Sequence, residues 1–241
     1  QYRSGALQDV PGITDLVRSH GALTVWDASH AAGSVDLRFD EWGVDLAVGC
    51  TYKYVNSGPG APGWLYVNAA RQAELHVPIQ GWFANRDQFA MGPAFVPADG
   101  IRRFQIATPP VIGLRAVRVA TRMIERAGMT AISAKAQQGT DLMIALFDEW
   151  LEPLGFTLLT PRDPAQRGGH ITIGHPDAKQ IAAAMRVLTK TIPDYRVPDS
   201  IRLAISPLPT SYTEVWDGFD RLRDLVASGR YRDVAATGRV T

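Results

Sequence analysis

The chain has 241 residues, of which 46% are hydrophobic and 20% are charged, and this composition is typical of a globular protein with a sizeable core. Its 25 Lys and Arg against 24 Asp and Glu leave a formal charge of +1, which gives no electrostatic reason to expect binding to nucleic acid or to an anionic membrane. No run of about 18 apolar residues predicts a membrane span, and the start does not resemble a signal peptide. The single cysteine, Cys50, cannot form a disulfide within the chain, so we expect a reducing, cytoplasmic location.

The first third of the sequence alternates between helical and extended patterns. A short helix is predicted to open at Pro11 and to end near Gly21, which suits a C-terminal cap. The compact apolar run 22–26 predicts a buried strand that ends at Asp27, and the run 44–50 predicts a second buried strand. Because strands and helices alternate, we expect an α/β layer with a mostly parallel sheet.

Residues 78–110 show neither a helical nor a strand period. They carry five prolines and four closely spaced aromatic residues, Trp82, Phe83, Phe89 and Phe95. A loop of this length in a compact chain is usually functional or lies against a partner, and a second copy related by a two-fold axis is the commonest partner. We therefore expect a homodimer with shared active sites. The alternative is that this segment packs on its own domain.

From residue 110 the pattern becomes helical. One helix is predicted from Val111 to Ile124, with Gly128 as its stop, and a second from 131 to 150. Short strands and helices then alternate, with strands predicted at 156–159, 170–173 and 201–205 and helices at 177–189 and 213–227. This second pattern predicts a separate α+β domain.

Asp27 and Lys53 each follow a predicted strand. In open α/β sheets, ligands bind beyond the carboxyl ends of the strands. A lysine there can form a Schiff base with an aldehyde cofactor, and a carboxylate can keep the pyridine nitrogen of pyridoxal phosphate protonated. The alternative is an ordinary solvated lysine and a loop-capping aspartate, which is the commoner situation for both residue types.

Two motifs around these residues resemble the kynureninase family, which belongs to the fold-type-I, class V aminotransferase-like enzymes that use pyridoxal phosphate. They are WDASH at 26–30 and GCTYKYVNSGPG at 49–60. Further matches follow in the family's order: QGWF at 80–83, PADG at 97–100, TPP at 108–110, DYRVPDSIR at 194–202, SPL at 206–208 and EVW at 214–216. The likeness runs along nearly the whole chain.

The resemblance implies a fold and a domain division. Residues 1–110 would form the second half of a large cofactor-binding α/β domain, 111–130 a connecting helix, and 131–241 a small α+β C-terminal domain. The family's pattern begins before the stretch that matches Tyr2. We therefore expect a partial chain, without the residues that complete the phosphate and aryl sites.

The resemblance also implies four residues around the cofactor. Lys53 would be the Schiff-base lysine and Asp27 the partner of the pyridinium nitrogen. His30 would lie beside the cofactor, and Tyr52 would reach its phosphate and assist proton transfer. The alternatives are that His30 is a loop histidine with local partners and that Tyr52 packs its ring.

Three further residues have roles implied by the resemblance. Trp82 and Thr108 would reach the cofactor site of the neighbouring subunit, and Arg202 would clamp the substrate's α-carboxylate, a task that suits its planar fork of donors. Trp82 could instead be a core residue, as large aromatics usually are. Arg202 lies on an apolar predicted strand, where a buried arginine needs an anionic partner.

Two other residue types are interpreted as structural. Cys50 lies within a predicted strand, and we expect it in the core. His170 and His175 lack a third ligand at a suitable spacing, so we expect no metal site.

The resemblance implies hydrolysis of L-kynurenine to anthranilate and L-alanine, in tryptophan catabolism. 3-Hydroxykynurenine, which would give 3-hydroxyanthranilate, stays open as a substrate, because this part of the family's pattern does not decide between the two. The chain also departs from the family after Phe83, where Ala84 and Asn85 follow in place of the frequent Gly-His, and this leaves the identity of the aryl substrate open. One alternative is a class V aminotransferase acting on another amino acid, and another is a partial, non-catalytic paralogue that acts by association. A cysteine desulfurase is disfavoured, because no cysteine follows Lys53.

Overall fold

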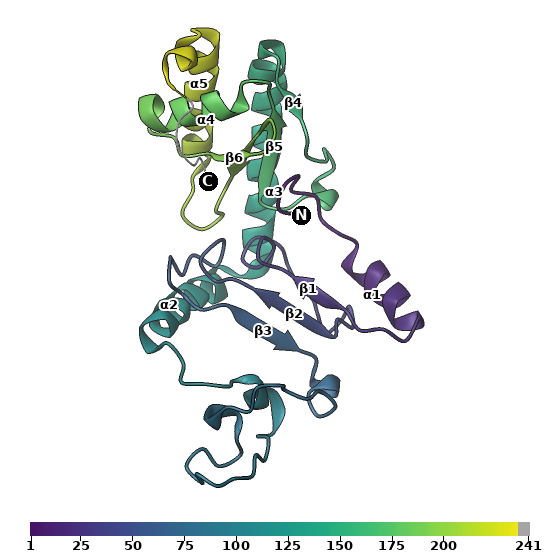
Figure 1. Ribbon diagram of the computed structural model, residues 1–241. Coiled ribbons are helices and arrows are strands. Elements are labelled where there is room, and N and C mark those ends of the chain that lie inside the picture. The colour runs from purple at the N-terminus through teal and green to yellow at the C-terminus, as the bar shows by residue number, and fades with distance from the viewer. Residues whose placement is uncertain (236–241) are drawn as a thin grey trace. The chain divides into compact units, whose positions relative to one another are not determined.

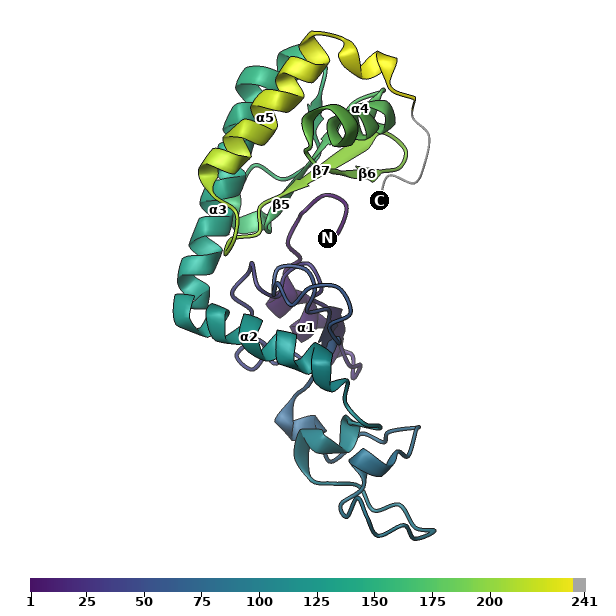
Figure 2. The same ribbon diagram turned by 90° about the vertical axis from the view of Figure 1, so that its left-hand side faces the viewer.

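The computed structural model describes residues 1–235, which divide into two compact units (Figures 1 and 2). The first, here the N-terminal unit, comprises residues 9–32 and 37–123. The second, the C-terminal unit, comprises residues 1–8, 33–36 and the described chain from 124 onward. The division into domains at 1–110, 111–130 and 131–241 stays a prediction.

The N-terminal unit is built on a three-stranded sheet of order β1-β2-β3 (Figure 1). Its strands are β1 (Val25–Asp27), β2 (Leu46–Gly49) and β3 (Trp64–Val67). β1 runs parallel to β2, and β3 runs antiparallel to it. Helix α1 (Val10–Ser19) precedes the sheet, and helix α2 (Val111–Ala127) begins in this unit and ends in the other. The predicted strands therefore exist, each shorter than its apolar run.

The expectation of fully buried strands is wrong for one face of this sheet. Val25 is 67% exposed, Val48 38% and Leu65 41%. The strand register places all three on the same face, because side chains alternate along each strand. Cys50, expected in the core, is also partly exposed, and its backbone N–H donates to Ser29 Oγ at 3.2 Å.

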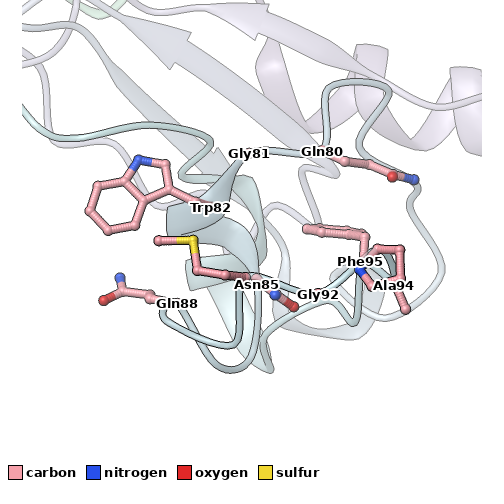
Figure 3. A pocket seen from close by; sticks show the side chains of 10 residues that line it. Gln80, Gly81, Trp82, Asn85, Gln88, Gly92, Ala94 and Phe95 are labelled. Atoms are coloured by element: carbon pink, nitrogen blue, oxygen red, sulfur yellow. The ribbon is translucent and has the colours of Figure 1, made fainter.

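The segment from 78 to 110 contains single turns of 3-10 helix at Trp82–Ala84 and Gly100–Phe104 and no strand, as its lack of periodicity predicts. Trp82 lies edge-on to Phe83 and to Phe89, with ring centroids 4.6 and 5.9 Å away. A hollow of about 360 Å³ opens here, and Figure 3 shows Trp82 and Phe95 on opposite sides of it. Phe89 is nevertheless 72% exposed, so the segment does not cover its own apolar side chains.

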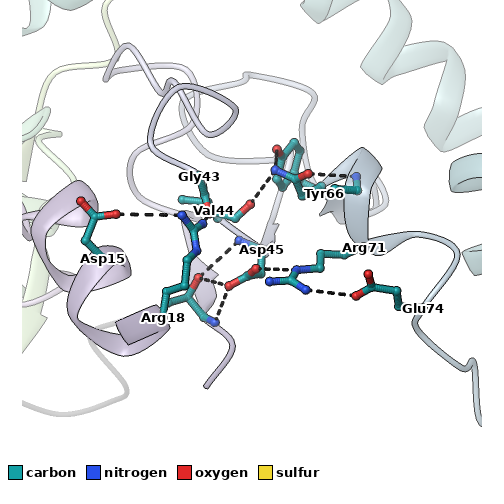
Figure 4. A network of polar contacts seen from close by, with 11 residues as sticks. Asp15, Arg18, Gly43, Val44, Asp45, Tyr66, Arg71 and Glu74 are labelled. Atoms are coloured by element: carbon teal, nitrogen blue, oxygen red, sulfur yellow. Dashed lines mark hydrogen bonds and ion pairs between the residues drawn. The ribbon is translucent and has the colours of Figure 1, made fainter. Parts of the chain in front are cut away.

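A buried carboxylate ties the start of β2 to its neighbours (Figure 4). Asp45 is 2% exposed and accepts hydrogen bonds from the backbone N–H of Thr24 at 3.1 Å and from Arg71 Nε at 3.0 Å. Burial raises the pKa of the Asp45 carboxyl, but these hydrogen bonds outweigh it and hold the pKa below its ordinary value. The network fixes the end of the sheet opposite to the one that carries Asp27.

The C-terminal unit contains an antiparallel sheet of order β4-β5-β7-β6. Its strands are β4 (Thr157–Leu158), β5 (His170–Gly174), β6 (Asp194–Arg196) and β7 (Ser200–Ala204). Its helices are α3 (Met129–Leu146), α4 (Ala178–Ala184) and α5 (Tyr212–Ala227). α5 begins with a capping box in which Ser211 and Glu214 bond each other's backbone. α3 and α5 pack along each other, and α4 packs on β6 and β7 (Figure 2).

Sequence reasoning missed strand β6. Its residues Asp194, Tyr195 and Arg196 show no apolar alternation, and the strand exists because it pairs with β7 at the edge of the sheet. The other elements of this unit lie close to their predicted ranges. Short polar edge strands carry little local signal because pairing, not burial, maintains them.

The core of the C-terminal unit offers a direct test of its packing. Ile173 of β5 is fully buried, so Ile173→Ala should lower the free energy of unfolding by about 2–5 kcal/mol. The matched control is Ile192→Ala, since Ile192 is 77% exposed and its truncation should cost less than about 0.5 kcal/mol. Urea denaturation of both variants measures the difference, and equal losses would contradict this assignment of the core.

Candidate functional site

Asp27 and Lys53 lie at the same edge of the N-terminal sheet. Asp27 is the last residue of β1, and Lys53 follows β2, which ends at Gly49. Because β1 and β2 are parallel, their carboxyl ends meet at one edge, the usual place for a ligand in an open α/β sheet. The turn after Lys53 contains Asn56, Gly58 and Gly60, all with positive φ, a conformation that glycine adopts without strain.

Lys53 has a close polar neighbour. Its Nζ lies 3.5 Å from His30 Nδ1 and 5.4 Å from the centroid of the Tyr52 ring. His30 therefore lies beside the lysine, and its predicted place beside the cofactor stays a prediction. Tyr52 is 52% exposed, so its hydroxyl is accessible, and both its predicted role at the phosphate and the alternative of local packing stay open.

Asp27 is held in its ionised form. The Ser29 hydrogen bonds, one of them from the backbone N–H to Asp27 Oδ1 at 2.9 Å, hold the pKa of the Asp27 carboxyl below its ordinary value. The positive charges of Lys53 and His30 act in the same direction. A carboxylate that stays ionised can keep a nearby heteroaromatic nitrogen protonated. The sheet edge thus gathers a carboxylate, an amine, an imidazole and a phenol.

Trp82 and Thr108 lie on the irregular segment of the same unit. Trp82 is 42% exposed and lines the hollow of Figure 3 together with Gln80 and Asn85, so it is not a core residue. Thr108 is also exposed and lies three residues before Val111, the first residue of α2. Both side chains are accessible to a partner, and their predicted role in a neighbouring subunit stays a prediction.

Arg202 lies on β7 in the C-terminal unit, with a side chain that is 10% exposed. Its Nε donates to Asp194 Oδ2 at 3.1 Å, its Nη2 donates to the same oxygen, and its Nη1 donates to the carbonyl of Tyr2 at 2.8 Å. The arginine has the anionic partner that its buried position requires. Sequence reasoning missed Asp194, because the signal is a cross-strand pairing between β6 and β7.

The described residues hold neither a cluster suited to a metal ion nor a membrane-spanning helix. Within residues 1–235, no three His, Cys, Asp or Glu side chains are arranged to hold a metal ion. None of the helices in this part of the chain is long and apolar enough to cross a membrane.

The sequence of the chain is similar to kynureninases. Residues 132–222 match the family described as the kynureninase C-terminal domain. A kynureninase of Burkholderia mallei (strain SAVP1) is 37% identical over 231 residues, which cover 96% of this chain and 55% of that protein. The chain therefore spans about half the length of the curated relatives it matches. The predicted resemblance to the C-terminal part of the kynureninase pattern is confirmed.

Solved structures show the fold. An alanine–glyoxylate aminotransferase of Nostoc sp. superposes with a TM-score of 0.69 at 21% identity, over 92% of this chain and 58% of that one. A C-DES mutant with glycine covalently linked to its PLP cofactor superposes with a TM-score of 0.77 at 18% identity, over 92% and 58%. The predicted fold class, an α/β second half of a fold-type-I large domain followed by a small α+β domain, is confirmed.

Proposed function

Because the chain carries the C-terminal part of the kynureninase pattern, we propose that it belongs to a pyridoxal-phosphate-dependent hydrolase that cleaves L-kynurenine to anthranilate and L-alanine. The observation that supports this most is the grouping of Asp27, His30 and Lys53 at the carboxyl edge of two parallel strands. 3-Hydroxykynurenine, which the same chemistry would cleave to 3-hydroxyanthranilate and alanine, is the alternative substrate and should be supplied separately in the test below. We place the protein in the cytoplasm.

The residues at the sheet edge fit the cofactor. Lys53 has the amine that would hold the aldehyde carbon, and Asp27 is ionised as a partner of the ring nitrogen must be. His30 stands next to the lysine, and the hydroxyl of the exposed Tyr52 is available to a phosphate oxygen. When bound, the protonated ring supplies an electron sink for a carbanion at the substrate's α-carbon.

Three side chains of the protein would have separate roles in the reaction. Lys53 Nζ would take and return the proton at the α-carbon, as a positioned general base. Tyr52 would assist that proton transfer with its phenol. Arg202 would bind the α-carboxylate through its guanidinium, which fixes the orientation of the substrate. Cleavage of the Cβ–Cγ bond further needs water to add to the side-chain ketone.

Product analysis tests this proposal against an aminotransferase. The protein as its organism makes it, supplied with pyridoxal phosphate and L-kynurenine, should release anthranilate and alanine in equal amounts, measured by fluorescence and amino-acid analysis. A keto acid without alanine would indicate an aminotransferase, and no turnover of either kynurenine would favour a non-catalytic paralogue. Either result would overturn the proposal.

We also propose that the working unit is a homodimer whose sites are shared through the segment 78–110. In this segment Phe89 is 72% and Met91 80% exposed, and a two-fold partner would cover them. Trp82 and Thr108 would then reach the cofactor of the other subunit.

Subunit complementation measures whether sites are shared. Lys53→Ala protein and Trp82→Ala/Thr108→Ala protein should each be inactive, and mixing them should restore activity. Each mixed dimer should contain one working site, made from the intact Lys53 of one chain and the intact segment of the other, and one inactive site. Exchange of subunits is verified with two differently tagged chains. If tagged subunits exchange and no activity returns, the sites are not shared.

A further inference from the structure

Three charged side chains form one cluster on the C-terminal sheet. Asp194 on β6 is the cross-strand partner of Arg202 on β7, and Arg196 lies two residues along β6, on the same face. Asp194 Oδ2 accepts hydrogen bonds from Arg202 Nε at 3.1 Å and from Arg196 Nη2 at 3.3 Å. The three side chains are only 10%, 33% and 29% exposed for Arg202, Asp194 and Arg196. We name this group the Arg–Asp–Arg cluster.

The Arg–Asp–Arg cluster carries an excess positive charge. Two guanidinium groups share one carboxylate, which leaves a net charge of +1 in a partly buried place. Glu214 lines the same cavity as Arg202, but Ser211 holds it in the N-terminal cap of α5, where Glu214 Oε2 accepts at 2.8 Å. A cluster of this charge favours an anionic ligand.

Asp194 fixes the plane of the Arg202 guanidinium. Arg202 Nε and Nη2 lie on one side of the planar fork, and both donate to Asp194 Oδ2. Nη1 donates to the Tyr2 carbonyl at 2.8 Å, so the group is held from two directions. Bidentate recognition of a carboxylate depends on the orientation of this plane.

Asp194 is itself held in place. Its backbone pairs with β7, and both arginines bond its carboxylate. Moving it away would leave two guanidinium charges close together without a counter-charge, which is costly in a partly buried site. The arrangement therefore holds the Arg202 guanidinium in one orientation, and we call it the frame.

A cavity of about 250 Å³ adjoins this frame, and Asp194 and Arg202 both line it. Thr191 lines it too, and its Oγ1 is buried without a hydrogen-bond partner among the described residues. An unsatisfied hydroxyl in a lined cavity indicates space for a polar ligand group. The frame therefore stands beside a space that can hold part of a ligand.

We propose that Asp194 is a positioning residue, which orients Arg202 for the α-carboxylate of an amino-acid substrate. This rests on the role of Arg202 in the proposed function. Loss of Asp194 should raise KM for L-kynurenine about 10- to 100-fold with little change in kcat. The reason is that the Arg202 guanidinium, which binds the substrate, would lose its fixed orientation. Asp194→Asn keeps an oxygen acceptor but loses the counter-charge, so its KM should lie between those of the wild type and Asp194→Ala.

The experiment compares Asp194→Ala, Asp194→Asn and a matched control, Asp199→Ala. Asp199 lies next to the start of β7, 4.0 Å from Arg3 in an exposed ion pair, so its loss should change neither KM nor kcat. Thermal unfolding verifies that each variant is folded. A KM increase in Asp194→Ala that Asp194→Asn partly reverses supports the proposal. An unchanged KM, a lower KM, or an equal loss in both Asp194 variants overturns it.

A second readout does not depend on turnover. The ¹⁵N Nε–H signal of Arg202, assigned by its loss in Arg202→Lys, is followed while L-alanine is added as the probe. Asp194→Ala should shift this signal and weaken the response to L-alanine about tenfold relative to Asp199→Ala. If wild-type protein cleaves no kynurenine, the proposed function fails, and this titration still decides the role of Asp194. An Arg202 signal and an L-alanine affinity that match the Asp199→Ala control overturn it.

Discussion

Lys53→Ala should abolish kynurenine cleavage, with a fall in kcat of about 10⁴-fold or more, as is typical when a covalent catalytic residue is removed. Lys53 is the only lysine at the sheet edge that carries Asp27 and His30. The variant protein should also lose the visible absorbance of a lysine-bound cofactor. Steady-state kinetics and absorbance spectra measure the two effects on the same preparation.

The control for this prediction is Lys179→Ala. Lys179 is an exposed residue of α4 in the other unit, and its loss should leave both kinetics and spectrum unchanged. A Lys53→Ala protein that keeps its absorbance and more than a tenth of wild-type activity would show that another group holds the cofactor.

Arg202→Ala should raise KM strongly and leave the cofactor absorbance intact. Removing one partner of a buried, hydrogen-bonded charge pair costs about 2–5 kcal/mol, which corresponds to an increase in KM of roughly 30-fold or more. Arg202→Lys should recover little of this, because an ammonium cannot reproduce the two-donor fork. Kinetics with L-kynurenine over a wide concentration range measure both variants.

Arg196→Ala is the informative comparison for Arg202. Arg196 shares the same Asp194 oxygen at 3.3 Å but is not the residue that the family motif assigns to the carboxylate. If Arg202→Ala leaves KM unchanged and Arg196→Ala raises it, the carboxylate clamp is Arg196.

Much of the fold follows from the sequence where local pattern and tertiary packing agree. The amphipathic helices α2 and α5, the more apolar helix α3 and the apolar strand β5 lie near their predicted ranges, since their apolar patterns match the surfaces they pack on. Strand β6 was missed because Asp194 and Arg196 face partners supplied by β7. The prediction for Val25 is wrong in the opposite sense. Its apolar run predicts a buried strand, but Val25 is exposed, because the burial of a sheet face depends on what packs against it.

Part of the candidate site, the shared edge of Asp27 and Lys53, was predictable from the sequence. The order of strands and loops places Asp27 and Lys53 at one edge, because parallel strands end together. The contact of Lys53 with His30 was not predicted, because it depends on how the loops after β1 and β2 fold back on each other. Nothing local indicated that Asp194 would bond Arg202 and Arg196, because those contacts depend on the register of β6 against β7.

The most direct test of the account is the position of the cofactor's covalent link. The sequence has four lysines, at 53, 135, 179 and 190, so borohydride reduction of the cofactor-loaded protein followed by peptide mapping has few possible outcomes. The account predicts a phosphopyridoxyl group on Lys53, at near one group per chain, and none on the other three. A group on Lys135, Lys179 or Lys190 in place of Lys53, or an even spread over all four, would contradict it.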